Sequence, residues 1–557
     1  MNSLARNFPL LHIFAVFGVC TWVFAGGDGG MIAPFIPWLV LFTVEAMLFP
    51  QCRQDETYPD ARARAWGGLV KDPLFYAVAA LCVYLAIPFF NTSLCWICDA
   101  DKLPPAYPGM DVDYANPACS WLPFCMHADM HFEVFTWFAP PLLGALAAKH
   151  ALRSEGKRHL LELMCWNGAA LAVFGFIQAQ TDAAAPFWFK PLAPYTATDA
   201  ASYPHRPFSV FSYPNAGATF FAMLFAVSCG IWQSKYAFIK ALPSHREFEH
   251  VKPPSYPFLR SHYMIAAAVL NFLGSLHTGS RAGWYSSIFL GVTMAIHVFA
   301  GYFQKADRLG KIRTAATALG LAAAASLAVA VFAPSEDGEE TEDLRHRKAE
   351  RVSGAEKAHK DVMETSAVSF FDRITGRVPS IATRVAWKLV KDHPWCGTGG
   401  WGFVDNGTWM VTPYARGRWS ELDDDAWEKL CRDWLHENNG ECSVGGANVH
   451  NDYLQFLAEH GIFGILLLAA VFLLLARPAF SEWRARLKAI KFSKGAETPA
   501  HPFVLYVMPT PVYGVMLGTA AIMIHAMADC PLRCGANTSL IFLSWACIGG
   551  FLFEDRR

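Results

Sequence analysis

Long apolar segments dominate this chain and constrain its fold more than any other feature. A helix that crosses a bilayer needs about 20 mostly apolar residues. Hydrophobic residues make up 54% of the 557 positions and charged residues only 17%, whereas an average soluble protein carries roughly 25% charged residues. The sequence therefore predicts an all-α integral membrane protein with about twelve transmembrane helices. The apolar segments lie near residues 8–26, 31–50, 73–91, 132–148, 159–178, 213–233, 262–278, 283–303, 314–333, 453–476, 506–528 and 536–553.

The distribution of lysine and arginine predicts how these helices are oriented. With the N-terminus in the cytoplasm, the cytoplasmic segments carry 26 basic residues, and 15 more lie in the long segment 334–452. Long loops are exempt from the positive-inside rule. Both termini are then cytoplasmic, and the first apolar segment, which no small-residue cleavage site follows, is expected to be a retained helix. The short outer loops carry only five basic residues: Lys102, Lys190, Arg206, Arg281 and Arg533.

This topology divides the chain into three parts. Residues 1–333 hold the first nine spans, residues 334–452 form one large, mainly helical outer loop, and residues 453–557 hold the last three spans. Within the loop, the apolar spacing from Ile381 to Val390 predicts a short amphipathic helix. The glycine-rich run that follows lacks the strand and the Lys-Thr ending of a nucleotide motif, so we interpret it as a turn where the backbone approaches a ligand.

Cysteines and tryptophans are concentrated in the predicted outer loops. An oxidising compartment permits structural disulfides; a redox or metal site and free thiols remain alternatives, although no complete zinc pattern is present. The tryptophans either pack and anchor the loop at the membrane interface or stack on sugar rings. The residues concerned are Cys95, Cys98, Cys119, Cys125, Cys396, Cys431, Cys442, Cys530 and Cys534, with Trp409, Trp419, Trp427 and Trp434.

Five stretches carry a family resemblance. They read HRPFSVFSYPNAGATFFAML from residue 205, HTGSRAGW from 277, DHPWCGTGGWGF from 392, NVHNDYLQFLAEHGIFG from 448 and HAMADCPLRCGANTSLIF from 525. In this order and at these predicted membrane depths, they resemble the signature of the O-antigen ligase and polymerase superfamily. The resemblance extends over residues 200–553, and the loop 92–131 and the insertion 405–446 depart from it.

The resemblance implies a GT-C-like, inverting, metal-independent glycosyltransferase without a cofactor. Members of the superfamily transfer a glycan from a polyprenyl-diphosphate carrier to a hydroxyl on the periplasmic face of the bacterial inner membrane. The acceptor is the lipid A-core in ligases, another glycan in polymerases, and a protein hydroxyl in protein O-oligosaccharyltransferases. We favour the ligase because the outer loop is large, and the other two acceptors remain open. Membrane lipids are expected partners, and nucleic acid is not.

Arg206, Arg281 and Arg384 are the candidates for binding the donor diphosphate. Arginine stays charged and presents a planar fork to phosphate oxygens. Arg206 precedes the sixth span, Arg281 separates the seventh from the eighth, and Arg384 lies on the amphipathic helix of the loop. The alternatives are interfacial snorkelling for the first two and a surface salt bridge for the third.

His450 is the candidate catalytic base, because its ordinary pKa lies near neutral pH. It directly precedes a span, and helix capping is the alternative. Asn451 is a favoured residue for the N-cap of that helix, and Tyr453 can share a face with His450. Asp529, in the last outer turn, either orients a histidine or pairs with an arginine. The resemblance predicts no metal ligands.

Two functions of other classes remain as alternatives. Twelve spans suit a transporter of lipid-linked glycans, but transporters usually show repeated halves and charges near the membrane midplane. We find no repeat, and the candidate charges gather on the outer face. An assembly partner without activity is the second alternative, which the presence of His450, Arg206 and Arg281 disfavours.

Overall fold

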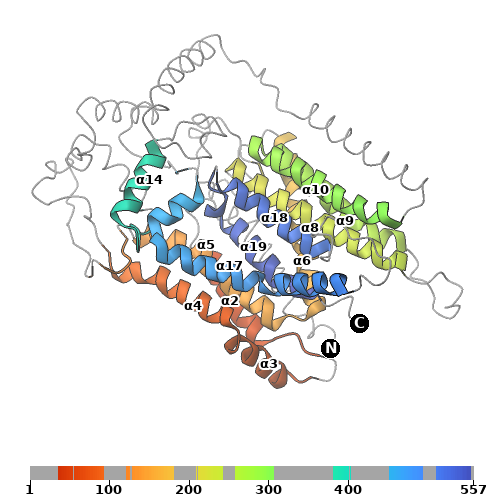
Figure 1. The fold of residues 1–557 in the computed structure, drawn as a ribbon, viewed down its shortest axis with the longest axis horizontal. Coiled ribbons are helices and arrows are strands. Elements are labelled where there is room, and N and C mark those ends of the chain that lie inside the picture. The colour runs from red at the N-terminus through yellow and green to blue at the C-terminus, as the bar shows by residue number, and fades with distance from the viewer. Residues whose placement is uncertain are drawn as a thin grey trace, which may run out of the picture. The chain divides into compact units, whose positions relative to one another are not determined.

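The computed structural model describes a helical protein (Figure 1). The described residues are 35–53, 56–92, 119, 121–125, 128–180, 208–209, 211, 213–241, 257–305, 381–400, 402, 449, 451–492, 510–527 and 529–552. In these ranges the elements of secondary structure are α-helices and 3₁₀ helices. The α-helices are α2 (Phe35–Leu48), α3 (Tyr58–Val70), α4 (Pro73–Ala86), α5 (Ala128–Ala151), α6 (Ser154–Gln180), α8 (Pro214–Ala241), α9 (Pro257–His277), α10 (Arg281–Lys305), α14 (Ile381–Asp392), α17 (Asp452–Phe492), α18 (Thr510–His525) and α19 (Gly535–Cys547). Short 3₁₀ turns follow at η2 (Ile87–Phe90), η7 (Pro531–Arg533) and η8 (Ile548–Gly550).

The helices agree with the apolar pattern of the sequence. Within the described ranges, ten of the twelve expected spans coincide with a helix, and the segments near 8–26 and 314–333 lie outside them. Four helical stretches of the described chain are long and apolar enough to cross a membrane: Pro73–Phe90, Ser154–Gln178, Pro214–Ser234 and Asp452–Ala485. The chain is therefore a multi-pass helical membrane protein. The count of twelve spans and the placement of the loops stay predictions.

The chain forms two compact units. The first unit comprises residues 1–86, 132–327 and 464–557, and the second comprises residues 87–131 and 328–463. Among the described residues, the second unit contains η2, residues 121–125, α14 and the start of α17. The predicted boundaries at residues 333 and 452 stay predictions.

Helix α8 lies at the centre of the first unit. Of its apolar window 78% is buried within the protein, against 28% for α4. Its Phe220 and Phe221 pack against each other with ring centroids 5.6 Å apart. Helix α10 approaches α8 closely at Gly283, where a Cβ atom would collide with the Cβ of Ala218. The glycine of the Ser-Arg-x-Gly stretch is thus required for the packing of these two helices.

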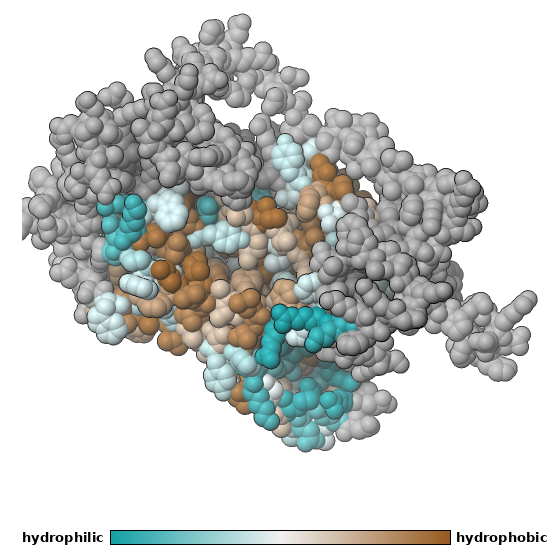
Figure 2. All heavy atoms as spheres, viewed as in Figure 1, coloured by the Kyte–Doolittle hydropathy of each residue, from teal (hydrophilic) through white to brown (hydrophobic). Residues whose placement is uncertain are grey.

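Hydrophobic side chains cover much of the protein surface, as a bilayer requires. Figure 2 shows apolar residues over the middle of the helices and hydrophilic residues over α3 and the C-terminal end of α17. Large apolar side chains are exposed on the outer helices, including Val44, Tyr76, Val83, Leu466 and Leu473. A surface of this kind is costly in water and favourable against lipid.

Two segments that the basic-residue count assigns to one side lie together in the first unit. These are residues 51–72 and 149–158, and the backbone N–H of Gln51 donates to the carbonyl of Ala151 over 2.9 Å. The structure thus brings them to the same end of the helices. That this end faces the cytoplasm stays a prediction.

An ion-pair cluster joins the same segments. The Asp72 carboxylate lies 2.6 Å from the Lys149 ammonium and 2.9 Å from the His150 imidazole. Burial raises the pKa of Asp72, but the hydrogen bonds from His150 and Lys149 outweigh it and hold the pKa below its usual range. Asp72 is therefore ionised and fixes the start of α4 to the end of α5.

In the second unit, a loop segment is inserted into the backbone of α17. The helix is interrupted at Gly461, whose φ is 61°. On one side of the break, the N–H groups of Thr398 and Gly399 donate to the carbonyls of Ala458 and Glu459 over 3.1 and 2.7 Å. On the other side, the N–H groups of two residues donate to loop carbonyls: Ile462 to Pro394 over 2.8 Å and Phe463 to Trp395 over 3.1 Å. The glycine-rich turn therefore approaches the backbone of α17.

Gly461 is needed at this junction for two reasons. Its φ lies in the left-handed region that favours glycine. A Cβ at this position would also collide with the carbonyl of Trp395. The inserted segment thus provides hydrogen-bond partners for four backbone groups of α17 at the break.

Only some of the cysteines for which disulfides are predicted lie within the described residues. Cys95, Cys98, Cys431 and Cys442 lie outside them, so pairing in those loops stays a prediction. Cys530, which flanks the last short turn, donates from its thiol to the Asp529 carboxylate over 3.4 Å. A bridge from Cys530 to Cys534 is therefore not formed in this structure.

Candidate functional site

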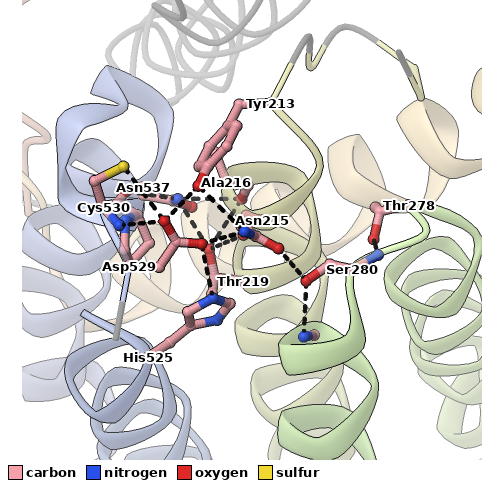
Figure 3. A network of polar contacts seen from close by, with 12 residues as sticks. Tyr213, Asn215, Ala216, Thr219, Thr278, Ser280, His525, Asp529, Cys530 and Asn537 are labelled. Atoms are coloured by element: carbon pink, nitrogen blue, oxygen red, sulfur yellow. Dashed lines mark hydrogen bonds and ion pairs between the residues drawn. The ribbon is translucent and has the colours of Figure 1, made fainter. Parts of the chain in front are cut away.

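Three of the stretches singled out in the sequence meet at one end of the first unit. They are the start of α8, the turn between α9 and α10, and the turn between α18 and α19. Figure 3 shows their polar side chains directed toward one another. We call this group, formed by Tyr213, Asn215, Thr219, Ser280, His525, Asp529 and Asn537, the polar cluster.

The Asp529 carboxylate is the main acceptor of the polar cluster. Tyr213 donates its hydroxyl and Asn215 its side-chain amide to this carboxylate. The backbone N–H of Cys530 donates to Asp529 Oδ1 over 2.8 Å. Asp529 is only 4% exposed, and these donors compensate for the cost of burying a charge. The carboxylate therefore joins the start of α8 to the turn after α18.

The second part of the polar cluster connects α8 to the first turn of α10. Ser280 donates its hydroxyl to Asn215 Oδ1, and its Oγ accepts the N–H of Gly283 over 3.0 Å. Ser280 is thus the N-cap of α10. Arg281, the first residue of that helix, lies next to the cap.

The third part connects α19 to α8. The Asn537 amide nitrogen lies 3.1 Å from the carbonyl of Ala216, 3.1 Å from Thr219 Oγ1 and 2.9 Å from the carbonyl of Pro531. Asn537 is fully buried. The N-termini of α8, α10 and α19 consequently lie close together at the polar cluster, and the positive ends of their helix dipoles favour negative charge there.

A buried histidine also lies beside Asp529. Nε2 of His525, at the end of α18, is 3.5 Å from Asp529 Oδ2. His525 is 5% exposed, and its Nδ1 has no hydrogen-bond partner among the described residues. Among the described residues, His525 is therefore a histidine that Asp529 contacts.

The entry to α17, in the second unit, is fixed by two side chains. Asn451 Oδ1 accepts the N–H of Leu454 over 3.0 Å, so Asn451 caps the helix. Gln455 Oε1 accepts the N–H of Val449 over 3.1 Å, and its amide donates to Glu459 over 3.2 Å. The residue just before position 450 is thereby tied to the first turns of α17.

The structure describes the predicted site residues to different extents. His450 and Arg206 lie outside the described residues. Arg281 begins α10 and Arg384 lies in α14, and the side chains of both are outside the described part. Asn451, Tyr453 and Asp529 are described, and Tyr453 is 39% exposed on the first turn of α17. The roles of all seven residues in a reaction stay predictions.

Several polar residues of these regions were not singled out from the sequence. Asn215, Ser280, His525 and Gln455 are uncharged or lie inside apolar stretches, so the charge pattern did not mark them. Asn215 and Ser280 are, however, the asparagine of the Pro-Asn pair and the serine of the Ser-Arg-x-Gly stretch that carry the resemblance. Among the described residues, no group of three or more His, Cys, Asp or Glu side chains is placed to hold a metal ion.

The fold and the polar cluster define a class: a multi-pass helical membrane protein in which one group of polar side chains gathers where the N-termini of α8, α10 and α19 meet (Figure 3). Residues 266–469 match the family model described as O-Antigen ligase, which supports the resemblance to the O-antigen ligase superfamily. The matched segment includes Ser280, Arg281 and the entry to α17. The superfamily is a group of glycosyltransferase-like membrane enzymes of polysaccharide biosynthesis. No curated protein matches the chain.

Proposed function

We propose that this protein transfers a glycan from a polyprenyl-diphosphate carrier to an acceptor hydroxyl, with the lipid A-core as acceptor. The observation that supports this most is the family match over residues 266–469. The reaction takes place on the periplasmic face of the bacterial inner membrane, is inverting and requires no metal.

In the proposed reaction, arginine side chains bind the donor. Arg281, Arg206 and Arg384 hold the two phosphates and stabilise the charge that develops on the diphosphate as it leaves. The position of Arg281 at the first residue of α10 supports this role, because a helix N-terminus and a guanidinium both attract anions. The three helix N-termini that meet at the polar cluster add to this attraction for the diphosphate.

His450 removes the proton from the acceptor hydroxyl. The oxygen attacks the anomeric carbon of the donor, the bond from that carbon to the diphosphate oxygen breaks, and the proton passes to the imidazole. Asn451 and Gln455 support this role, because both fix the chain at the entry to α17 on either side of position 450.

A polymerase, whose acceptor is another glycan, and a protein O-oligosaccharyltransferase are the alternatives within the superfamily. Deletion of the gene separates the three acceptors when surface glycans and glycoproteins are resolved on gels. We expect the loss of the glycan ladder and the accumulation of free lipid A-core. Single-repeat products would indicate a polymerase, and altered glycoprotein mobility would indicate protein transfer. A normal glycan pattern in the deletion strain would contradict a transferase. A failure of donor flipping in that strain would then favour a transporter, and a failure of complex formation would favour an assembly partner.

A further inference from the structure

We propose that Asn215 is a positioning residue for Arg281: it acts through Ser280 to fix the first turn of α10 relative to the Asp529 turn. This inference rests on the function proposed above. Asn215 lies in the first turn of α8, and neither the charge pattern nor the matched segment includes it.

A continuous chain of hydrogen bonds carries the argument (Figure 3). The Gly283 N–H donates to Ser280 Oγ. The Ser280 hydroxyl donates to Asn215 Oδ1, and the Asn215 amide donates to Asp529. In this chain, the neighbours of each group determine whether it donates or accepts. Hydrogen bonds in such a chain strengthen one another.

The chemistry of the partners fixes the orientation of the Asn215 amide. A carboxylate can only accept, so the amide nitrogen must face Asp529 and the oxygen must face Ser280. Ser280 must then donate its single proton to Asn215 and can accept only from the α10 backbone. The hydroxyl that caps α10 is therefore oriented by Asn215 and, through it, by Asp529.

The consequence falls on Arg281, which is the residue directly after the cap. Bidentate binding of a diphosphate requires that the guanidinium be placed in a narrow range of positions. Without the bond from Asn215, the Ser280 hydroxyl can rotate, and the first turn of α10 loses its hydrogen-bonded connection to Asn215 and, through it, to Asp529. We therefore expect the donor diphosphate to bind more weakly although no residue that contacts it has changed.

The test measures binding of a long-chain polyprenyl diphosphate to the purified full-length protein in detergent, by native mass spectrometry. The variants are Asn215→Ala, Ser280→Ala and the double variant. Asn271→Ala is the control, because Asn271 is another asparagine that bridges helices, from α9 to Cys165 of α6, and it is fully buried, whereas Asn215 is half-buried. Melting temperatures are measured for all variants.

We expect Asn215→Ala and Ser280→Ala to bind roughly 10- to 100-fold more weakly, as for the loss of one charge-assisted hydrogen bond. The double variant should be no weaker than the weaker single variant, because both remove the same connection. Asn271→Ala should lower the melting temperature and leave the affinity of the folded protein unchanged.

Three outcomes would overturn the inference. Binding within twofold of the parent in both single variants, additive losses in the double variant, or an equal loss in Asn271→Ala would each show that Asn215 does not act through Ser280 on the donor site. A parent protein that fails to bind the polyprenyl diphosphate would instead contradict the proposed function itself.

Discussion

Asn215 donates a hydrogen bond to Asp529, although 314 positions separate the two residues. The bond joins the first turn of α8 to the turn before α19, and its acceptor Asp529 is buried whereas its donor Asn215 is half-buried. Because a buried carboxylate needs its donors and the donors need their acceptor, this relationship has a measurable effect on stability.

We expect Asp529→Ala to lower the free energy of unfolding by about 1–3 kcal/mol, because it leaves buried donors without their acceptor. The melting temperature in detergent measures the effect. Asp392→Ala is the control: its carboxylate forms an ion pair on α14, 3.5 Å from Lys388, and is 29% exposed. Such a pair contributes about 0–1 kcal/mol. Equal melting temperatures for Asp529→Ala and the parent would show that the buried carboxylate is not a stabilising group.

Arg281→Lys is expected to be nearly as damaging as Arg281→Ala. Lysine keeps the charge but loses the two-pronged geometry that fits a diphosphate. The loss should appear as a higher KM for the donor in transfer assays. Lys71→Ala serves as a control, because Lys71 is exposed at the end of α3. Full activity of the lysine variant would reduce Arg281 to a general interfacial charge.

His450→Ala should reduce transfer by about 10²- to 10⁴-fold, the usual contribution of general acid–base catalysis. The diphosphate should still bind, since the arginines remain, and His450→Gln should fail as well because glutamine cannot accept a proton at neutral pH. In the parent, the rate should rise with pH as the imidazole loses its proton. An active His450→Gln variant at normal expression would leave His450 a structural cap.

Gly461→Ala should destabilise the protein by at least roughly 1–3 kcal/mol, the cost of one residue held in an unfavourable backbone region. The added Cβ also meets the Trp395 carbonyl, so α17 and the inserted segment must separate. Protease resistance of the folded protein measures the loss. Gly67→Ala in α3 is the matched control, because no atom lies within 4 Å of its Cβ position. A Gly461→Ala protein as resistant as the control would mean that the junction tolerates a side chain.

The membrane orientation is tested by cysteines introduced at Ala489 and Gly407 and labelled with an impermeant thiol reagent. We expect the probe at Gly407 to react in intact cells and the probe at Ala489 to react only after the membrane is opened, because basic segments stay in the cytoplasm. The parent, with its native cysteines, gives the background. The reverse pattern would invert the topology.

Most helices were predictable because lipid-facing segments must be apolar throughout. Helix α3 was not: it lies in the basic segment 51–72, where no span is expected. The structure places a helix at Tyr58–Val70, with the N–H of Asp60 donating to the Thr57 hydroxyl over 3.4 Å. This Thr-x-x-Asp start was visible in the sequence and is a capping signal.

The break in α17 and the polar cluster could not be predicted in the same way. Both depend on contacts between segments far apart in the chain, and no local pattern specifies them. Arg281 and His450 were selected because their charge or pKa stands out in an apolar sequence. Asn215 and Ser280 stand in the stretches that carry the resemblance, but only the structure shows that they contact each other.

The segment inserted at Gly461 also bears on how the protein is made. Thr398 lies 60 positions before its partner Ala458, so the ribosome completes the glycine-rich segment well before it completes α17. In the predicted topology the glycine-rich segment must cross the membrane, and until it reaches α17 the carbonyl and N–H groups at the break would lack these partners. Correct maturation of this helix is therefore expected to depend on prior export of the loop, and shortening the connection between residues 400 and 449 should arrest biogenesis at that step.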